Sequence, residues 1–291
     1  MTPIKRRGSF DTMDITTAII VFLITGIGVG FTSGMLGVGG SFIMTPAQYW
    51  IYTTMGISSD LAIKVAFGTS LFVVLPTAIS GALGHTKRGV VCWRAGFVLG
   101  MTGAAGAVVG STIAAHLPGR VLVVAFGCVV TATVIRMLTA NPPEVEDTPK
   151  DRPLTLAAWG FLLGILPGIV GIGGGVIVIP VMILALKFKI HHAVGTSTAF
   201  MIFASLGGLL GYIYNGLAAG VVGACQIGHL VGYVNLESCL ALTATSVPMA
   251  RVGVRTAHRL PGTQLRYIFI VAMLYVGLKM MGVFSYLGLP I

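Results

Sequence analysis

The stretch SGMLGVGGSFIMTP, residues 33–46, recurs in altered form as PGIVGIGGGVIVIP, residues 167–180. In both copies, glycines interrupt a long apolar run in which a helix is expected. Glycine has no side chain and tolerates a positive φ, so the backbone can turn there and leave amide groups without an intrahelical partner. Such amides are costly in lipid unless they are buried or face water. Each stretch therefore predicts a helix that is broken at a functional position.

The composition places the chain in a lipid bilayer. Of its 291 residues, 55% are hydrophobic and only 9% are charged, and 41 are glycine. Soluble domains carry roughly 25% charged residues. Apolar runs recur from residue 15 onward, each about as long as the ~20 residues that span a bilayer as a helix, without the alternation of a barrel strand. The sequence predicts an all-α polytopic protein of the cell membrane.

The formal net charge of +10 does not indicate nucleic-acid binding. The Lys and Arg residues are scattered among short loops instead of forming one basic domain, as is typical of charges that set membrane orientation. The four cysteines lie in or beside apolar segments without metal or redox spacing, so we expect them to be packing residues. No metal or other cofactor is expected, and the sequence predicts no oligomeric state.

The chain is an internal duplication. The glycines and proline of the two stretches match one by one, and FGTS at residues 67–70 matches VGTS at residues 194–197. We predict an N-terminal tail (1–14), a first repeat (15–139), a cytoplasmic linker (140–153) and a second repeat (154–291). Each repeat holds five apolar segments: 15–33, 41–52, 61–83, 91–115 and 121–138 in the first, and 154–167, 176–186, 193–214, 236–249 and 265–281 in the second.

Five segments per repeat predict that the second copy is inserted upside down. The loop charges agree: loop 53–60 has no Lys or Arg and loop 85–94 is basic, whereas the equivalent loop 187–192 is basic and the equivalent loop 215–233 has none. The basic cluster Lys5–Arg7 argues for the opposite side at the N-terminus, but several internal loops agree with one another. The sequence therefore predicts inverted repeats.

The broken helices suggest an anion site. A glycine turn followed by a helix N-terminus presents free amides and a partial positive charge, and two such turns from inverted halves can meet near the midplane. The alternative is close helix packing by small residues. A phosphate loop is excluded because the stretch lacks its lysine. The candidate residues are Gly37, Gly39, Gly40 and Ser41 in the first copy and Gly171, Gly173, Gly174 and Gly175 in the second.

Hydroxyl side chains recur in both copies inside otherwise apolar helices. They can donate to anion oxygens, or they can bond the carbonyl one turn earlier in their own helix. These residues are Thr69 and Ser70 in the first copy and Thr196, Ser197 and Thr198 in the second. Lys64 and His191 precede them at equivalent positions and could attract an anion, although Lys64 could instead extend to the membrane interface.

Acidic residues are scarce, which disfavours a cation substrate, because pumps and cation carriers use carboxylates inside the membrane. Glu237 is the one candidate coupling carboxylate, with a capping or interfacial role as its alternative. Asn215 and Gln226 lie in a glycine-rich insertion, where we expect loop or gate residues. No Ser/His/Asp, Cys/His or metal spacing indicates catalysis, so an enzyme is not expected.

At GMLGVGGSFIMTP, GIVGIGGGVIVIP and the two GTS segments, the sequence resembles the sulfite exporter TauE/SafE family, over about residues 20–281. The resemblance implies a secondary transporter that moves sulfur-containing anions, such as sulfite, sulfoacetate or related organosulfonates. It also implies that the hydroxyl pairs and six glycines line the substrate path: Gly37, Gly39, Gly40, Gly171, Gly173 and Gly174. The first copy departs from the fuller glycine pattern in having Ser41 where the second has Gly175. A passive anion channel and a membrane enzyme are the alternative functions.

Overall fold

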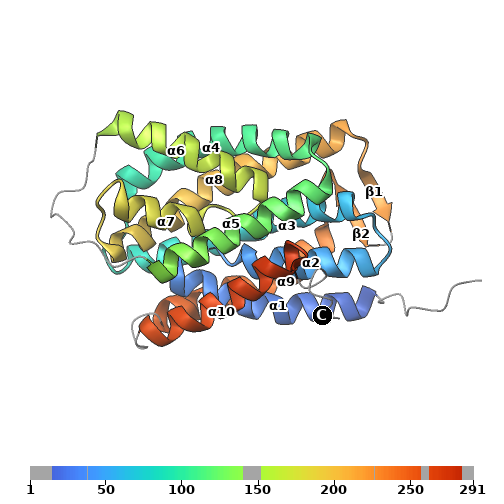
Figure 1. The fold of residues 1–291 in the computed structure, drawn as a ribbon, viewed down its shortest axis with the longest axis horizontal. Helices are drawn as coiled ribbons and strands as arrows, with labels where there is room; N and C mark the ends of the chain where they lie inside the picture. Colours follow the sequence, from blue (N-terminus) through green and yellow to red (C-terminus); the bar gives the residue numbers. More distant parts are fainter. Residues whose placement is uncertain (1–14, 38, 140–151, 226, 257–261, 284–291) are drawn as a thin grey trace, which may run out of the picture.

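A computed structural model describes residues 15–37, 39–139, 152–225, 227–256 and 262–283, which form an elongated bundle of helices (Figure 1). The elements are α1 (Ile15–Leu36), α2 (Ser41–Thr54), α3 (Ser59–Thr86), α4 (Trp93–His116), α5 (Gly119–Thr139), α6 (Pro153–Val170), α7 (Gly175–Leu184), α8 (Ile190–Ala218), β1 (Val222–Cys225), β2 (Gly228–Val231), α9 (Leu236–Thr256) and α10 (Gly262–Met280). The predicted tail and most of the predicted linker lie outside the described residues.

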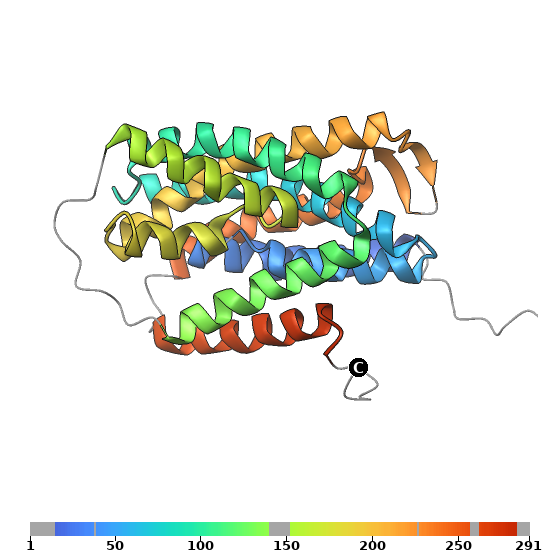
Figure 2. The same ribbon diagram turned by 45° about the horizontal axis from the view of Figure 1, so that its top comes forward.

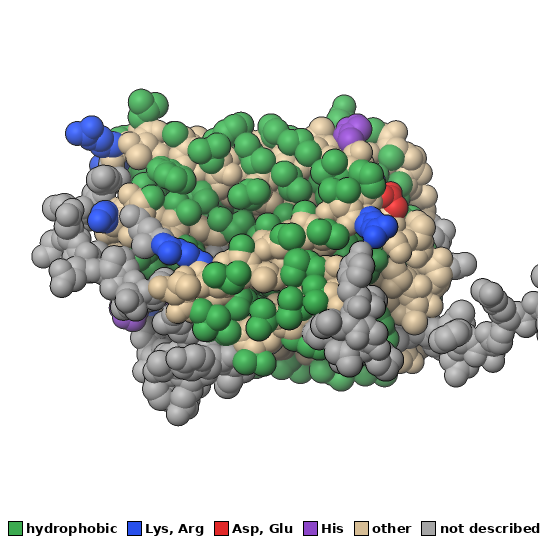
Figure 3. Space-filling model, viewed as in Figure 1, with side chains coloured by type: hydrophobic (Ala, Val, Ile, Leu, Met, Phe, Trp, Pro, Cys, Tyr) green, Lys and Arg blue, Asp and Glu red, His purple; other side chains and the backbone are tan. Residues whose placement is uncertain are grey.

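The helices have the length and apolar surface of a membrane bundle. Six of the described helices, α1, α3, α4, α5, α6 and α8, are long and apolar enough to cross a bilayer. Large apolar side chains cover one broad face, and charged side chains gather toward its two ends (Figure 3). Ile24, Phe97 and Leu162 are each more than half exposed, as lipid-facing side chains are. The prediction of an all-α polytopic membrane protein is confirmed.

Each predicted apolar segment corresponds to one helix, but the prediction of a loop over 215–233 is wrong. Helix α8 continues to Ala218, and Asn215 is part of it, because its amide nitrogen donates to Gly211 O at 2.7 Å and to Thr112 Oγ1 at 3.1 Å. Beyond the helix, β1 and β2 pair as an antiparallel hairpin, with Val222 opposite Val231. Gln226 lies outside the described residues.

Two long helix seams connect the halves of the chain, α1 with α9 and α6 with α4. Gly26, Gly30 and Gly34 face Leu242, Ser246 and Ala250, and the equivalent Gly160, Gly164 and Gly168 face Leu99, Gly103 and Ala107. A Cβ on any of these six glycines would overlap a backbone or hydroxyl oxygen of the facing helix. These glycines therefore serve close packing, and the seams exchange equivalent helices between the halves.

Two pairs of equivalent helices, α3 with α8 and α5 with α10, pack against each other. In the α3–α8 pair, Gly68 lies against Tyr212 while Gly81, farther along α3, lies against Thr198, earlier in α8. Helices α5 and α10 lie side by side (Figure 2), with Gly127 against Met281 and Thr131 against Gly277. Both pairs are antiparallel. Antiparallel packing of these two pairs is compatible with inverted repeats, which remain a prediction.

Candidate functional site

The two glycine-rich stretches break their helices at equivalent positions. After α1, φ is +66° at Gly37, +86° at Gly39 and +65° at Gly40; after α6, φ is +64° at Gly171, +71° at Gly173 and +99° at Gly174. Side chains other than glycine rarely adopt such angles. Gly40 and Gly174 cap the helices that follow, α2 of 14 residues and α7 of 10 residues. Both helices are shorter than the ~20 residues of a full membrane span.

The two turns are buried and touch each other. The Ser41 hydroxyl, at the first residue of α2, donates to Ile172 O in the other turn at 2.9 Å. Ser41 is fully buried. Segments separated by 131 residues are therefore joined directly at the two helix breaks.

Each turn packs on the third helix of the opposite half. Gly37 and Gly39 lie against Val194 and Met201 of α8, and Gly171 and Gly173 lie against the equivalent Phe67 and Val74 of α3. The Ser197 hydroxyl donates to Gly37 O at 3.2 Å, which ties the first turn to the second Gly-Thr-Ser segment. The structure thus brings the glycine turns of both copies, Ser41 and Ser197 into one buried region.

The N-termini of α2 and α7 open at these turns. The amides of Ile43 and Met44 both donate to Gly40 O, and those of Ile177 and Val178 both donate to Gly174 O. Amides that precede these positions have no carbonyl one turn earlier within their helix. The helix dipole also places partial positive charge there. Both turns, including Gly175 at the start of α7, have the local chemistry that suits an anion.

Ser70 belongs to a buried set of polar side chains around α2, which we call the first-half network because four of its five members lie in the first half: Thr45, Gln48, Tyr52, Ser70 and, from α9 of the second half, Ser238. The hydroxyls of Thr45 and Ser70 lie 3.0 Å apart, and Gln48 Nε2 donates to Ser70 Oγ at 3.2 Å. The Tyr52 hydroxyl lies 3.1 Å from Gln48 Oε1 and 2.9 Å from Ser238 Oγ. The network joins α2, α3 and α9.

In the second half, the equivalent hydroxyls bond differently. Ser197 donates to Val194 O at 2.7 Å and Thr198 donates to Gly195 O at 2.6 Å. Both hydroxyls therefore bond a carbonyl of their own helix, which the sequence analysis gave as the alternative to anion binding. The positions equivalent to Thr45, Gln48 and Tyr52 are Ile179, Met182 and Leu186. The second half therefore has an apolar contact where the first has a network.

The equivalent threonines of the two Gly-Thr-Ser segments, Thr69 and Thr196, each accept a hydrogen bond from a backbone amide just before another helix. Thr69 Oγ1 accepts a hydrogen bond from the amide of Asn235 at 3.0 Å, and the equivalent Thr196 Oγ1 accepts one from the amide of Cys92 at 3.0 Å. Each acceptor holds the segment that enters α9 or α4. Both threonines are fully buried.

The basic residues expected to attract an anion lie at helix starts. Lys64 is only 7% exposed, and its ammonium lies 3.0 Å from Asp60 Oδ2, one turn earlier in α3. An approaching anion would therefore meet an ion pair instead of a bare ammonium, and Lys64 does not extend to an exposed position. His191 is exposed in the first turn of α8.

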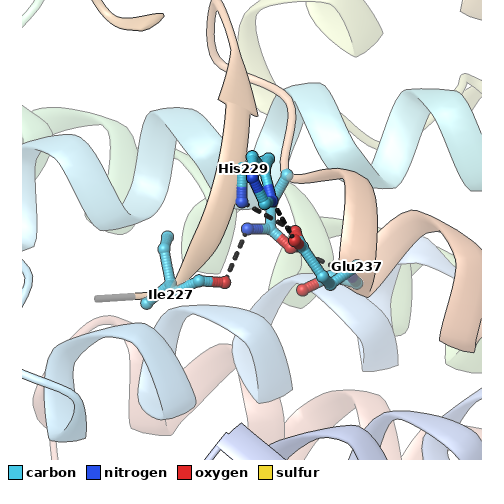
Figure 4. Close-up of polar contacts among 5 residues, drawn as sticks. Ile227, His229 and Glu237 are labelled. Atoms are coloured by element: carbon cyan, nitrogen blue, oxygen red, sulfur yellow. Dashed lines mark hydrogen bonds and ion pairs between the residues drawn. The ribbon is translucent and has the colours of Figure 1, made fainter. Parts of the chain in front are cut away.

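Glu237 fastens the β-hairpin to the first turn of α9. The His229 ring and backbone amide both donate to the Glu237 carboxylate, at 2.7 Å and 2.8 Å (Figure 4). Asn235 adds a bond from its Nδ2 to Ile227 O at 2.8 Å. Partial burial acts to raise the pKa of Glu237, but the hydrogen bonds from His229 and from its own amide outweigh burial and hold the pKa below its usual value.

Sequence reasoning missed most of the first-half network and missed Ser205. Thr45, Gln48 and Tyr52 stand at helical spacing in an apolar segment, so they share one face of α2, and this pattern could have marked them. No sequence pattern marks Ser205, because what distinguishes it is its position in the fold: its buried hydroxyl lies near Gly173 and has no hydrogen-bond partner among the described residues. Among the described residues, no three His, Cys, Asp or Glu side chains come close enough to hold a metal ion.

Comparison with known proteins identifies the family of this chain. A family profile described as sulfite exporter TauE/SafE matches residues 22–280. The chain belongs to the TauE/SafE family. It is therefore a multi-pass membrane transporter of the cell membrane.

Relatives of similar length are named as transporters. A probable membrane transporter protein of Haemophilus influenzae is 25% identical over 91% of this chain and 98% of its own length. One from Methanocaldococcus jannaschii is 26% identical over 90% of this chain and 94% of its own length. One from Xylella fastidiosa is 31% identical over 62% of this chain and 68% of its own length. No solved structure matches the chain.

Proposed function

We propose that the protein is a secondary transporter that exports sulfur-containing anions, such as sulfite or organosulfonates, and that the anion binds where the two glycine turns meet. The observation that carries this proposal is the direct contact between the turns, Ser41 Oγ to Ile172 O at 2.9 Å, beside two helix N-termini. Amides and dipoles from opposite halves converge there, and they can bind an anion without a buried cationic side chain.

The scarcity of buried charged side chains supports an anionic substrate. Among the described residues, Lys64 is the one buried side chain with a permanent charge, and Asp60 accompanies it. No buried carboxylate among the described side chains is available to bind a cation or carry a proton across the interior. The sulfur centre of the substrate is supported by the family description.

The mechanism we propose is alternating access by two inverted repeats, approximately 15–139 and 154–291. It is supported by the antiparallel pairs α3–α8 and α5–α10 and by the exchanged seams α1–α9 and α4–α6. In such a fold, one set of helices rocks against the other about a fixed central site. A site shared by both turns can open first to one side and then to the other.

A passive anion channel and a membrane enzyme are the competing functions. A carrier exchanges labelled for unlabelled substrate and can transiently concentrate label against its gradient, whereas a channel lets both run down together. An enzyme would convert a candidate anion into product in the purified preparation. Counterflow in liposomes, with product analysis of the same samples, distinguishes all three.

The first experiment measures thermal unfolding of the purified protein in detergent with sulfite, sulfate, sulfoacetate, and carboxylate analogues of matched size. An anion that binds only the folded state stabilises it by about 2.7 kcal/mol at a hundredfold excess over its Kd. We expect sulfite or sulfoacetate to raise the melting temperature more than the carboxylates do, and to support counterflow. Absence of stabilisation by every anion, together with absence of counterflow, would contradict the proposal.

A further inference from the structure

Ser205 differs from the other serines near the glycine turns. It is fully buried on α8, and its hydroxyl has no hydrogen-bond partner in the described part of the chain. Ser197, two turns earlier on the same helix, bonds both Val194 O and Gly37 O. Buried hydroxyls almost always have a partner, so an unpaired one requires an explanation.

The Ser205 hydroxyl faces the second glycine turn. A Cβ built on Gly173 would lie 3.3 Å from Ser205 Oγ, close to hydrogen-bonding distance. Gly173 lies two residues before α7, whose ten residues begin at Gly175. The unpaired hydroxyl therefore lies beside the second glycine turn, two residues before α7 begins.

The first turn has no such donor. The position equivalent to Ser205 in α3 is Ala78, and the hydroxyl at the first turn itself, that of Ser41, is already bonded to Ile172 O. The second turn has Gly175 where the first has Ser41. The hydroxyl at the first turn, that of Ser41, thus has a hydrogen-bond partner, whereas the hydroxyl near the second turn, that of Ser205, has none among the described residues.

We propose that Ser205 is a substrate-binding residue that donates a hydrogen bond to the transported oxyanion at the N-terminus of α7. The inference rests on the proposed function, since it assigns the same site one further donor and places the anion nearer the second turn. An oxyanion with three oxygens, such as sulfite or a sulfonate, can offer one oxygen to the α7 amides and another to the hydroxyl. A methyl group at position 205 would leave that oxygen without its partner.

The test compares Ser205→Ala with the wild type in sulfite and sulfoacetate titrations, read as the shift in melting temperature and as counterflow. A hydrogen bond to a charged group accounts for roughly a tenfold or larger change in affinity. We expect the half-saturating anion concentration to rise by about that factor, while the melting temperature without anion stays at the wild-type value or rises, because an unpaired polar group is removed. Ser205→Cys, with a weaker donor of similar size, should fall between the two.

Ser111→Ala is the matched control. Ser111 is also fully buried in a helix, but its hydroxyl already has a partner, because it donates to Val108 O at 2.9 Å. This control should leave the half-saturating concentration unchanged. If wild type binds the anions and Ser205→Ala binds them equally well, the assignment of Ser205 is overturned and the proposed function stands. If wild type itself responds to no anion in either assay, both proposals are overturned.

Discussion

The two Gly-Thr-Ser segments occupy equivalent places in the two halves, yet their serines lie in opposite chemical surroundings. Ser70 is bonded to Thr45 and Gln48 of α2, in a network that continues to Tyr52 and Ser238. Ser197 bonds two backbone carbonyls, and the network positions in the second half hold the apolar Met182 of α7 and Leu186 just beyond it.

Comparing the two serines distinguishes features that both halves share from a feature that is built around only one of them. Both halves keep the positive-φ glycines and the threonine that holds the next helix entrance, so these belong to the common scaffold. The network is built around α2 of the first half, and the described residues at the equivalent positions in and just beyond α7 form none. Hydrogen bonds have a narrow range of favourable geometries, whereas apolar contact is non-directional. The α2 contact is thus fixed more tightly in position than the α7 contact.

Met182→Gln should have the largest effect, because it places an amide in a fully buried apolar site. The amide would lack the partners that the equivalent Gln48 has, and we expect the free energy of unfolding to fall by about 3 kcal/mol. Denaturation in detergent micelles measures the loss. Met182→Leu, which keeps the site apolar, should cost far less, and equal stability of the two variants would mean that the second half can accommodate a network.

Gln48→Met should have a smaller effect. It removes the bonds from Gln48 to Ser70 and Tyr52, but Thr45 still pairs with Ser70 and Ser238 still pairs with Tyr52. Two lost hydrogen bonds of about 1 kcal/mol each predict a loss of about 2 kcal/mol in the same denaturation measurement. A variant as stable as wild type would show that the network contributes nothing to stability.

Glu237→Gln should have the smallest effect, and it tests a further difference between the halves. The entrance to α9 is fastened by the hairpin through His229 and Glu237, whereas α4 follows α3 through a short turn. The interaction is largely exposed to solvent, so we expect a loss below about 1 kcal/mol at pH 7.

This loss should depend on pH in one direction. Because the pKa of Glu237 is lowered in the folded protein, the stabilisation is present above the unfolded pKa of 4.5 and is lost as the pH falls through the folded value. The difference in melting temperature between wild type and Glu237→Gln should therefore shrink toward acidic pH. A difference that stays constant from pH 7 to pH 3.5 would contradict the assignment.

The sequence indicated the helices and the breaks because both leave local signals. Apolar runs mark the helices, and a glycine that must adopt a positive φ, such as Gly174, can hardly be replaced. Asn215 was misassigned because Asn favours loops, whereas here its amide bonds back to Gly211 O in the helix. The bond from Gln48 to Ser70 and the missing partner of Ser205 depend on other helices, so no local pattern could predict them.

The exchange of helices between the halves also has a consequence for synthesis. The Thr245 hydroxyl of α9 donates to Leu23 O of α1 at 2.9 Å, across 222 residues of sequence. At typical elongation rates, α1 waits on the order of tens of seconds before α9 has been made. During that interval its glycine stripe at Gly26, Gly30 and Gly34 has no α9 to pack against. A nascent chain interrupted before α9 would therefore display an unfinished helix seam, by which membrane quality control could recognise it.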